Sequence, residues 1–356
     1  MTRIVNNFCI ILGTRPEIIK LSPIIRELQK QKTDFFIIHT NQHYSSNMDK
    51  IFFDELNLPQ PNYNLNIGSG THGDTTGRML QEIEKVLISK KPTVVLVQGD
   101  TNTVLAGALA ASKLHIKIGH IEAGLRSYDR TMPEEINRIL TDHISDFLFC
   151  PTKKQALILK KEGISENKIF ITGNTIVDAV FQNEKLINQT KYSQQKYFLL
   201  TTHRPSNVDD KTNLSSIINT VTLLSKQFNC KTYFPIHPRT KKQLEVFNIK
   251  LDSKYIVDLE PVGYLEMLAL EKYAKLIFTD SGGIQEEACI LKVPTITLRD
   301  NTERPETLKI KASILAGNNS QSIIKATTKM LSSNRNWPNP FGNGLTSQNI
   351  LKILIQ

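Results

Sequence analysis

One segment of this chain, residues 93–138, constrains the fold more than any other. It contains two apolar runs of strand length, TVVLVQ at 93–98 and IKIGHI at 116–121. Residues 103–114, which lie between them, are rich in Ala and Leu and suit a short helix. Strand, helix and strand together predict a βαβ unit, and therefore an open parallel sheet with helices packed on it.

Each of the two apolar runs is followed closely by a carboxylate. Asp100 stands in the sequence GDT after the first run, and Glu122 stands in HIEAG after the second. Ligands of open parallel sheets bind outside the carboxyl ends of the strands, so we expect both acids at that edge. A third acid, Glu134, opens the next predicted helix behind Pro133, a residue type favoured at first helical positions. We interpret these three acids as groups that transfer protons.

The rest of the chain repeats this alternation of strands and helices. With 356 residues, it is long enough for two domains of ordinary size. We expect one domain at 1–175, a second at 176–343, and a hinge in the polar segment 182–196. Residues 344–356 predict a helix that packs back on the first domain. The expected fold class is α/β, with two doubly wound, Rossmann-like domains that face a central cleft.

Two local patterns predict where helices begin. The strand expected at 8–12 leads into a helix at 17–30, which contains Pro23. Because Pro removes a helical hydrogen bond, we expect this helix to start late or to kink. Residues 66–77 are rich in Gly and Thr and predict a loop, with the next helix beginning at Arg78.

Composition places the chain among ordinary globular proteins, with 40% hydrophobic and 22% charged residues. No apolar run approaches the roughly 18 residues that a membrane helix needs, and the sequence begins without a signal-peptide pattern. We therefore expect a cytoplasmic protein with no membrane partner. The four cysteines are scattered and form no CxxC pair, so we expect buried thiols and neither a disulfide nor a metal site.

The formal net charge of +10 favours an anionic partner. The basic residues are spread as solvated lysines, and no zinc finger or RNA-binding aromatic motif accompanies them, so we expect no nucleic-acid partner. A phosphorylated small molecule is the expected anion.

The strongest phosphate signal is the sequence DSGGIQEE at 280–287. Gly282 and Gly283 lie at a predicted strand-to-helix turn, where backbone N–H groups can approach a phosphate and the helix N-terminus favours its charge. Ser281 adds a hydroxyl donor, and Glu287 is placed to accept from a ribose diol. A tight turn closed by an N-cap explains the motif equally well, and both interpretations stay open.

Cations and histidines lie at other predicted strand ends. Arg15 and Lys20 follow the first strand, where Arg can grip a diphosphate and Lys can supply a point charge. A surface pair is the alternative, more so for Lys20. His203 and His237 each end a strand of the second half, where a group that titrates near neutral pH is useful. Arg304, in TERPE, is a further cation candidate.

His120 lies inside its strand, and we interpret it as structural. Other reaction classes fit the sequence less well. The string GxGxxG at 68–73 follows a polar run instead of a buried strand, so a nicotinamide site is poorly supported. The sequence contains no GxxxxGK[ST], HExxH or GxSxG motif. What remains is an enzyme with acids, a histidine and a phosphate cradle, without a redox cofactor.

Seven segments of this chain occur together in one known family. In chain order they are GTRPE (13–17), GDT (99–101), GHIEAGLR (119–126), PEEINR (133–138), THR (202–204), DSGGIQEE (280–287) and TERPE (302–306). The set closely resembles the non-hydrolysing UDP-N-acetylglucosamine 2-epimerases, from about residue 8 to at least residue 318. The resemblance implies a GT-B-like fold, usually dimeric, that interconverts UDP-GlcNAc and UDP-ManNAc.

The resemblance also implies a mechanism. The family eliminates UDP across C1–C2 to leave a bound 2-acetamidoglucal, and UDP then adds back while a proton reaches the opposite face of C2. No cofactor is required. Asp100, Glu122 and Glu134 would be the acid/base carboxylates, and His203 would assist the leaving group. The residues implied to bind the UDP-sugar are Arg15, Lys20, Tyr264, Ser281, Gly282, Gly283, Glu287 and Arg304.

One departure from the family concerns a second UDP-GlcNAc site that many bacterial members use as an activator pocket. Their Gln-His-Arg-Gln-type segment here reads Gln42-His43-Tyr44-Ser45, and residues 66–77 contain no Arg. We therefore expect weak or absent activation by UDP-GlcNAc.

Four alternatives stay open. The first is a hydrolysing relative that releases UDP and free ManNAc, and the second is an epimerase of a more modified UDP-sugar, such as a diacetamido uronic acid. A GT-B glycosyltransferase would explain a UDP site but would leave the three acids without a role. A non-catalytic nucleotide-sugar sensor fits least well, because every acid that the chemistry needs is present.

Overall fold

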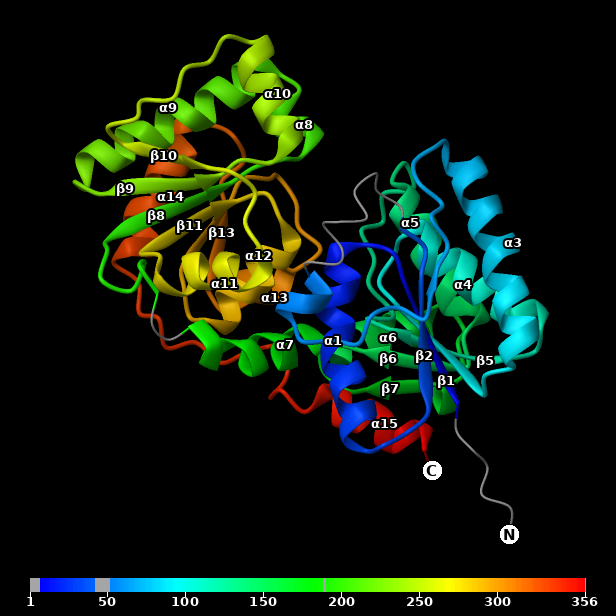
Figure 1. The fold of residues 1–356 in the computed structure, drawn as a ribbon. Helices are drawn as coiled ribbons and strands as arrows, with labels where there is room; N and C mark the ends of the chain where they lie inside the picture. The colour runs from blue at the N-terminus through cyan, green and yellow to red at the C-terminus, as the bar shows by residue number, and fades with distance from the viewer. Residues whose placement is uncertain (1–6, 42–51, 188–189, 356) are drawn as a thin grey trace. The chain divides into compact units, whose positions relative to one another are not determined.

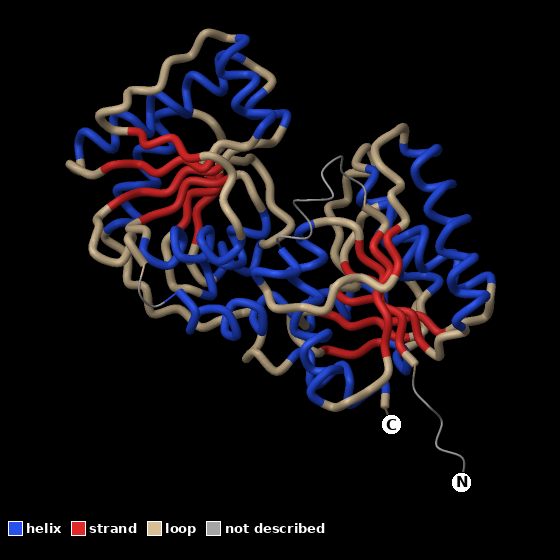
Figure 2. The backbone as a smooth tube through the Cα atoms, viewed as in Figure 1, coloured by secondary structure: helices blue, strands red, loops and turns tan. Residues whose placement is uncertain are grey.

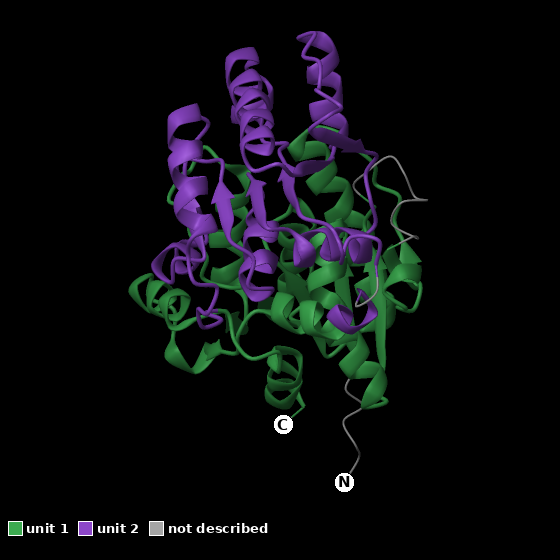
Figure 3. Ribbon diagram, turned by 90° about the vertical axis from the view of Figure 1, so that its left-hand side faces the viewer, with its two compact units in different colours: residues 1–182, 341–356 green, residues 183–340 purple. Residues whose placement is uncertain are grey.

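A computed structural model of the chain describes residues 7–41, 52–187 and 190–355. The chain forms two compact units, one of residues 1–182 with 341–356 and the other of residues 183–340 (Figure 3). The boundary expected after residue 175 lies at the start of helix α7 (Thr175–Glu184), and the division between the units lies near the end of that helix.

The first unit is built on a seven-stranded parallel sheet with the order β3-β2-β1-β4-β5-β6-β7 (Figures 1 and 2). The order reverses between β1 and β4, which creates a topological switch point at the carboxyl ends of these strands. The strands are β1 (Phe8–Leu12), β2 (Phe35–His39), β3 (Tyr63–Asn64), β4 (Val94–Gln98), β5 (Lys117–Ile121), β6 (Phe147–Cys150) and β7 (Ile169–Ile171).

Helices cover this sheet and bury its apolar side chains. Alternate residues of β1, Cys9 and Ile11, pack in one core cluster with residues of α3 and α4. The helices of this unit whose full bounds lie among the described residues are α1 (Arg15–Lys30), α3 (His72–Lys90), α4 (Asn102–Lys113), α5 (Pro133–Ile144), α6 (Lys153–Lys161), α7 and α15 (Thr346–Leu354). Asp178 of α7 accepts hydrogen bonds from the backbone N–H groups of Thr346 and Ser347, which fixes the first turn of α15 within this unit.

Two helix starts differ from the expectation. The late start expected for the first helix is wrong, because α1 begins at Arg15 and runs through Pro23. Pro23 has no N–H for the carbonyl oxygen of Ile19, and the hydroxyl of Ser22 donates to that oxygen instead at 2.8 Å. Helix α3 begins at His72, not at Arg78, because the Thr71 hydroxyl caps its first turn.

The second unit repeats the plan with a six-stranded parallel sheet in the order β10-β9-β8-β11-β12-β13. Its switch point lies between β8 and β11. The strands are β8 (Tyr197–Thr201), β9 (Lys231–Pro235), β10 (Ile256–Leu259), β11 (Leu276–Thr279), β12 (Thr295–Thr297) and β13 (Ser313–Leu315). The helices are α8 (Pro205–Val208), α9 (Lys211–Gln227), α10 (Pro238–Val246), α11 (Tyr264–Tyr273), α12 (Gly282–Ile290), α13 (Pro305–Lys309) and α14 (Ser320–Leu331).

Two doubly wound α/β units confirm the expected fold class. All four cysteines are buried free thiols, as expected. Among the helices of the described residues, none is long and apolar enough to span a membrane.

Candidate active site

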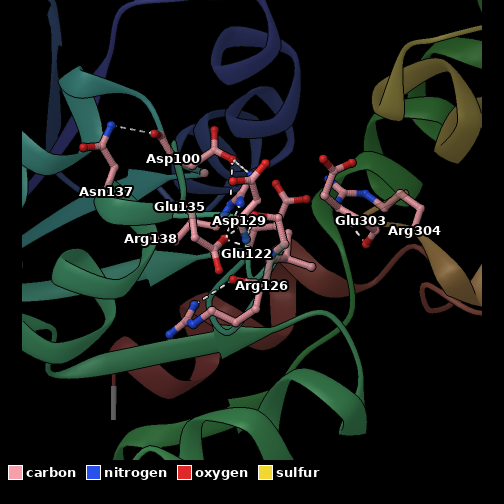
Figure 4. Close-up of polar contacts among 12 residues, drawn as sticks. Asp100, Glu122, Arg126, Asp129, Glu135, Asn137, Arg138, Glu303 and Arg304 are labelled. Atoms are coloured by element: carbon pink, nitrogen blue, oxygen red, sulfur yellow. Dashed lines mark hydrogen bonds and ion pairs between the residues drawn. The ribbon is translucent and has the colours of Figure 1, made fainter. Parts of the chain in front are cut away.

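Asp100 lies just beyond the end of β4, at the switch point of the first unit. Its Oδ2 accepts from Arg138 Nε at 2.9 Å and from Nη2 at 2.5 Å, and its backbone carbonyl accepts from the Asn137 amide at 2.9 Å (Figure 4). The carboxylate is still 31% exposed. Asp100 is therefore oriented by helix α5 and remains open to solvent and to a ligand.

Glu122 follows β5 in a strained conformation. Its φ of +72° is in the left-handed region, which costs a non-glycine residue on the order of 1–3 kcal/mol and is typical of functional sites. Its buried carboxylate accepts from Lys20 Nζ at 2.8 Å on both oxygens and from the Gln98 amide at 2.5 Å. Gly124 continues the turn with φ +80°, where a Cβ would lie 2.7 Å from the carbonyl oxygen of Gln155. The close approach of the Gln155 backbone therefore leaves no room for a side chain at position 124 of this turn.

Lys20 was expected on a phosphate, and the structure pairs it with Glu122. Its side chain is only 9% exposed, and that of Glu122 is 4% exposed. A buried ammonium that contacts both carboxylate oxygens favours the ionised form of that acid. Arg15, at the start of α1, lies with its guanidinium 4.7 Å from the centre of the Phe52 ring.

Helix α5 turns a polar face inward. Its buried residues are Glu135, Asn137, Arg138, Thr141 and Asp142. Glu135 accepts from the backbone N–H groups of Ser127 and Tyr128, each at 2.9 Å, and from Arg138 at 2.7 Å. Burial by itself would raise the pKa of Glu135, but these hydrogen bonds lower it. Glu134, the acid singled out from the sequence, is exposed in the first turn of the same helix.

Glu17 connects two loops of the switch point. Its Oε2 accepts from the N–H groups of Gly13 and Thr14 at 2.6 and 2.9 Å, and its Oε1 accepts from the Thr101 hydroxyl at 2.5 Å. Burial raises its pKa to about 7, against the opposing effect of these hydrogen bonds. The turn that carries Arg15 is thereby fastened to the turn that carries Asp100.

The switch point of the second unit holds a histidine and a buried aspartate. His203, after β8, has Nδ1 3.2 Å from Asp280 Oδ1, and its side chain is 39% exposed. Asp280 also accepts from the Thr202 hydroxyl at 2.7 Å and from the Arg204 N–H at 3.0 Å. Burial would raise the pKa of Asp280, but His203 and these donors lower it to about 2. The His237 ring lies beside His203, with centroids 5.3 Å apart.

The turn after β11 leaves space beside its glycines. Ser281 caps helix α12 through the backbone N–H of Ile284. A Cβ added to Gly282 would meet no atom within 4 Å, and one added to Gly283 would meet only the Ser281 hydroxyl, at 3.8 Å. The packing of the described residues therefore does not require glycine at either position. The open space suits the approach of a phosphate to the helix N-terminus.

The remaining candidates of the second unit lie among ion pairs. Arg304 Nε is 2.5 Å from Glu286 Oε1, and its side chain is 13% exposed. The neighbouring Glu303 forms an ion pair with Arg299 at 2.8 Å. Burial by itself would raise the pKa of Glu303, but Arg299 lowers it to about 2. Glu287 is buried on α12. Figure 4 shows Glu303 and Arg304 on adjacent positions of this segment.

Tyr264, expected near a uracil ring, is the first residue of α11 and is 2% exposed, which leaves its ring little surface to offer. The segment Gln42-His43-Tyr44-Ser45 lies outside the described residues.

The structure groups the expected residues by unit. Asp100, Glu122 and Lys20 lie at the switch point of the first unit, and His203, Ser281 and Gly282 lie at that of the second. Sequence reasoning assigned no role to the residues that hold them, which are Glu17, Gln98, Glu135, Arg138 and Asp280. The sequence carried no signal for the buried face of α5, because polar residues at 135, 138 and 142 with helical spacing ordinarily predict a face turned to solvent.

Comparisons with known proteins agree with this geometry. A family model described as UDP-N-acetylglucosamine 2-epimerase matches residues 26–355. The UDP-N-acetylglucosamine 2-epimerase of Methanocaldococcus jannaschii is 62% identical, over 97% of this chain and 98% of the relative. A crystal structure of the Methanocaldococcus jannaschii UDP-GlcNAc 2-epimerase, in complex with UDP-GlcNAc and UDP, matches with a TM-score of 0.91 at 62% identity. That match covers 98% of this chain and 99% of the crystallised one.

A more distant relative acts on a different sugar. The UDP-2,3-diacetamido-2,3-dideoxy-D-glucuronate 2-epimerase of Pseudomonas aeruginosa is 44% identical, over 97% of this chain and 98% of the relative. The family model and the first relative both extend over nearly the whole chain. Together with the paired acids at the switch point, they show that this chain belongs to the UDP-N-acetylglucosamine 2-epimerase family.

Proposed function

We propose that this chain interconverts UDP-GlcNAc and UDP-ManNAc reversibly, by elimination and re-addition of UDP and without hydrolysis. The observation that carries the proposal is the pair of carboxylates at one sheet edge, with Lys20 donating to both oxygens of Glu122 and Arg138 orienting Asp100. Further support for epimerisation at C2 comes from the 62% identical relative, which is named UDP-N-acetylglucosamine 2-epimerase.

C2 of the sugar is not next to a ketone, so its proton is not acidic enough for simple removal and return, and inversion at C2 needs acid/base groups on both faces. In the proposed elimination, a carboxylate removes the C2 proton, a C1–C2 double bond forms and the C1–O bond breaks, so that UDP leaves with the electron pair. In the return step UDP forms the C1–O bond again, and an acid delivers a proton to the opposite face of C2. Asp100 and Glu122 are proposed because they follow the ends of β4 and β5, and Glu134 is proposed because it is an exposed acid in the first turn of α5.

The proposed leaving-group site lies in the second unit. His203, held by Asp280, is the proposed partner of the diphosphate, and Ser281, Gly282 and Gly283 are the proposed phosphate donors. Arg15, Glu287 and Arg304 complete the proposed substrate contacts, whereas the buried ring of Tyr264 does not support the contact with uracil expected from the sequence. Lys20 is better supported as the partner of Glu122, since its Nζ lies 2.8 Å from both carboxylate oxygens.

We also propose a homodimer, on the resemblance to a family that is usually dimeric. Sedimentation velocity at micromolar concentration tests this, with one species of twice the chain mass as the expected result and a monomer as the contrary one.

Two alternatives share the elimination step. A hydrolysing enzyme would use water in place of UDP in the second half. An epimerase of a diacetamido uronic acid is favoured by the Pseudomonas aeruginosa relative at 44% identity, although the relative named for UDP-GlcNAc is closer, at 62%.

A proton NMR time course in deuterated water separates these alternatives. With UDP-GlcNAc as substrate we expect a growing UDP-ManNAc anomeric signal, deuterium at C2 and little free UDP. Free UDP with free ManNAc as the main products would indicate the hydrolysing enzyme. An unchanged spectrum, followed by turnover of the diacetamido sugar, would indicate the modified substrate.

A further inference from the structure

His120 is a buried histidine whose two ring nitrogens both face acceptors. It lies on β5 and is 1% exposed. Its Nδ1 is 2.7 Å from Asp142 Oδ1, and its Nε2 is 2.8 Å from the carbonyl oxygen of Gly99. A neutral imidazole carries one N–H and one acceptor nitrogen, whereas an imidazolium carries two N–H groups. Two N–H groups are needed to satisfy both contacts if Asp142 is ionised.

Asp142 is ionised in this arrangement. Its Oδ2 accepts from Arg126 Nη1 at 2.7 Å and from the Gly124 N–H at 3.2 Å. Burial opposes the charge, but His120 and Arg126 lower the pKa of this carboxyl. Both oxygens of Asp142 therefore act as acceptors, and His120 must donate from both of its nitrogens.

His120 belongs to a chain of side chains whose charges alternate in sign. Arg126 also donates to Glu162 at 2.8 and 2.6 Å, so the network alternates between imidazolium, carboxylate, guanidinium and carboxylate. The side chains of His120, Asp142 and Arg126 are each at most 1% exposed. Cys150 of β6 is a further titratable group beside this network, and its thiol pKa is raised by burial and by Asp142. Such a closed network avoids the large cost of an unpaired buried charge.

This network holds the backbone of both catalytic candidates in the first unit. His120 contacts the carbonyl oxygen of Gly99, the residue immediately before Asp100. Asp142 accepts from the N–H of Gly124, which lies two residues after Glu122. Gly99, Glu122 and Gly124 all have positive φ values, of +86°, +72° and +80°. The two glycines adopt this region without strain, but at Glu122 it persists only where the surroundings hold it, and the His120–Asp142 pair supplies part of that restraint.

We propose that His120 acts as a doubly protonated positioning residue, which aligns Asp100 and Glu122 with each other for proton transfer at C2. This inference rests on the proposed function. A ring with a single N–H can donate to only one of these two acceptors, so its other nitrogen would present a lone pair to the oxygen of Gly99 or of Asp142. One of the two loops would then lose its restraint, and proton transfer would slow. UDP binding does not depend on this ring and is expected to stay unchanged.

The first test reads the protonation state of the ring directly. The full chain, labelled with ¹⁵N-histidine, is examined by two-bond ¹H–¹⁵N correlation NMR at about pH 7.5, and His120 is assigned from a His120→Gln spectrum. We expect a pattern with both nitrogens protonated. A neutral tautomer at this pH would overturn the proposal. This readout is independent of catalysis, so it stands even if the proposed epimerase activity fails.

The second test separates positioning from binding. For His120→Gln, which keeps a single donor group, we expect C2–deuterium exchange to fall about 100-fold, as for a misplacement near 1 Å. The UDP dissociation constant, measured by calorimetry, should not change. The matched control is His143→Gln, on the exposed side of α5, where only a bond to the Ile139 carbonyl is lost.

Three outcomes of the second test bear on the proposal. His120→Gln with wild-type exchange would overturn it. A parallel loss of UDP affinity would indicate a merely structural role and would also overturn it. If the wild-type chain itself shows no C2 exchange with any UDP-sugar, the proposed function fails, and the NMR test alone decides the protonation state of His120.

Discussion

At the scale of the residue, Lys20 contacts Glu122, whereas the sequence left open whether Lys20 binds a phosphate or lies at the surface. For Lys20→Met we expect C2–deuterium exchange to fall by about 100-fold or more, because Glu122 loses the cation that holds it ionised as a proton acceptor. The UDP dissociation constant should stay the same. Both are measured on one preparation, by NMR in deuterated water and by calorimetry.

The control for this variant is Lys30→Met, on the last turn of the same helix, where the side chain is 71% exposed. It should preserve exchange and UDP binding. If Lys20→Met instead loses UDP affinity and keeps exchange, Lys20 is a phosphate ligand and its pairing with Glu122 has no catalytic role.

Glu17 gives a pH-dependent prediction at the same scale. Burial raises its pKa from 4.5 to about 7, so the folded chain binds this proton more tightly than the unfolded chain. Its contribution to stability is therefore complete below pH 4.5 and is lost as the pH rises through about 7. A glutamine amide resembles the protonated carboxyl at every pH. We expect the stability of Glu17→Gln, relative to wild type, to rise by up to about 3 kcal/mol between about pH 5 and about pH 8.5.

Urea unfolding at both pH values measures this difference. Glu166→Gln is the control, because that carboxylate is 76% exposed and the same chemical change should give no pH-dependent difference. Parallel pH profiles for wild type and Glu17→Gln would contradict a proton held by the buried carboxyl.

At the scale of the element, helix α5 carries two adjacent acids, an exposed Glu134 and a buried Glu135, for which we expect different roles. For Glu134→Gln we expect turnover to fall about 100-fold with little loss of stability, because the side chain is exposed and is a proposed acid/base group. For Glu135→Gln we expect the free energy of unfolding to fall by about 1–3 kcal/mol, because one carboxylate oxygen accepts from the Ser127 N–H and the other from the Tyr128 N–H.

Steady-state kinetics and urea unfolding of both variants check this division of roles. Wild-type turnover in Glu134→Gln would remove Glu134 from the acid/base set.

The elements themselves were largely predictable from sequence. Apolar runs followed by short polar motifs predicted β4, α4 and β5 and placed Asp100 and Glu122 at strand ends, because periodicity and strand direction are local properties. The start of α1 was not predictable from Pro23 alone, since the Ser22 hydroxyl replaces the missing donor. The partners of Lys20 and Asp100 were not predictable either, because they come from elements distant in the sequence.

At the scale of the whole molecule, two sheets of the same plan each place their polar groups at a switch point. The alternation of strands and helices predicted two such units. The division between the units falls at residues 182 and 183, at the start of the polar segment 182–196, whereas the boundary expected after residue 175 falls at the start of α7. The hydrogen bonds that fix α15 to Asp178 join segments distant in the sequence. Contacts of this kind between distant segments leave no local mark in a sequence.

Ligand-linked stability of the whole chain tests the phosphate cradle. UDP at about 100 times its dissociation constant should stabilise the wild type by about 2.7 kcal/mol. In Gly282→Ala the added Cβ meets no atom within 4 Å, so the ligand-free variant should melt at least as high as wild type. Its UDP-induced shift should largely disappear, because the methyl group occupies the space of the phosphate.

Thermal unfolding with and without UDP measures both quantities. Gly77→Ala, within α3, also adds a Cβ to open space and should keep the full UDP shift. An undiminished shift in Gly282→Ala would place the phosphate elsewhere.

The central claim is that the C1–O bond to UDP breaks and re-forms during epimerisation. Positional isotope exchange tests this most directly, with UDP-GlcNAc that carries ¹⁸O in the bridge between C1 and the β-phosphorus. If UDP leaves and returns, the label must spread into the non-bridging β-phosphate oxygens while UDP-ManNAc forms, which ³¹P NMR detects. Epimerisation with the label kept entirely in the bridge would contradict elimination.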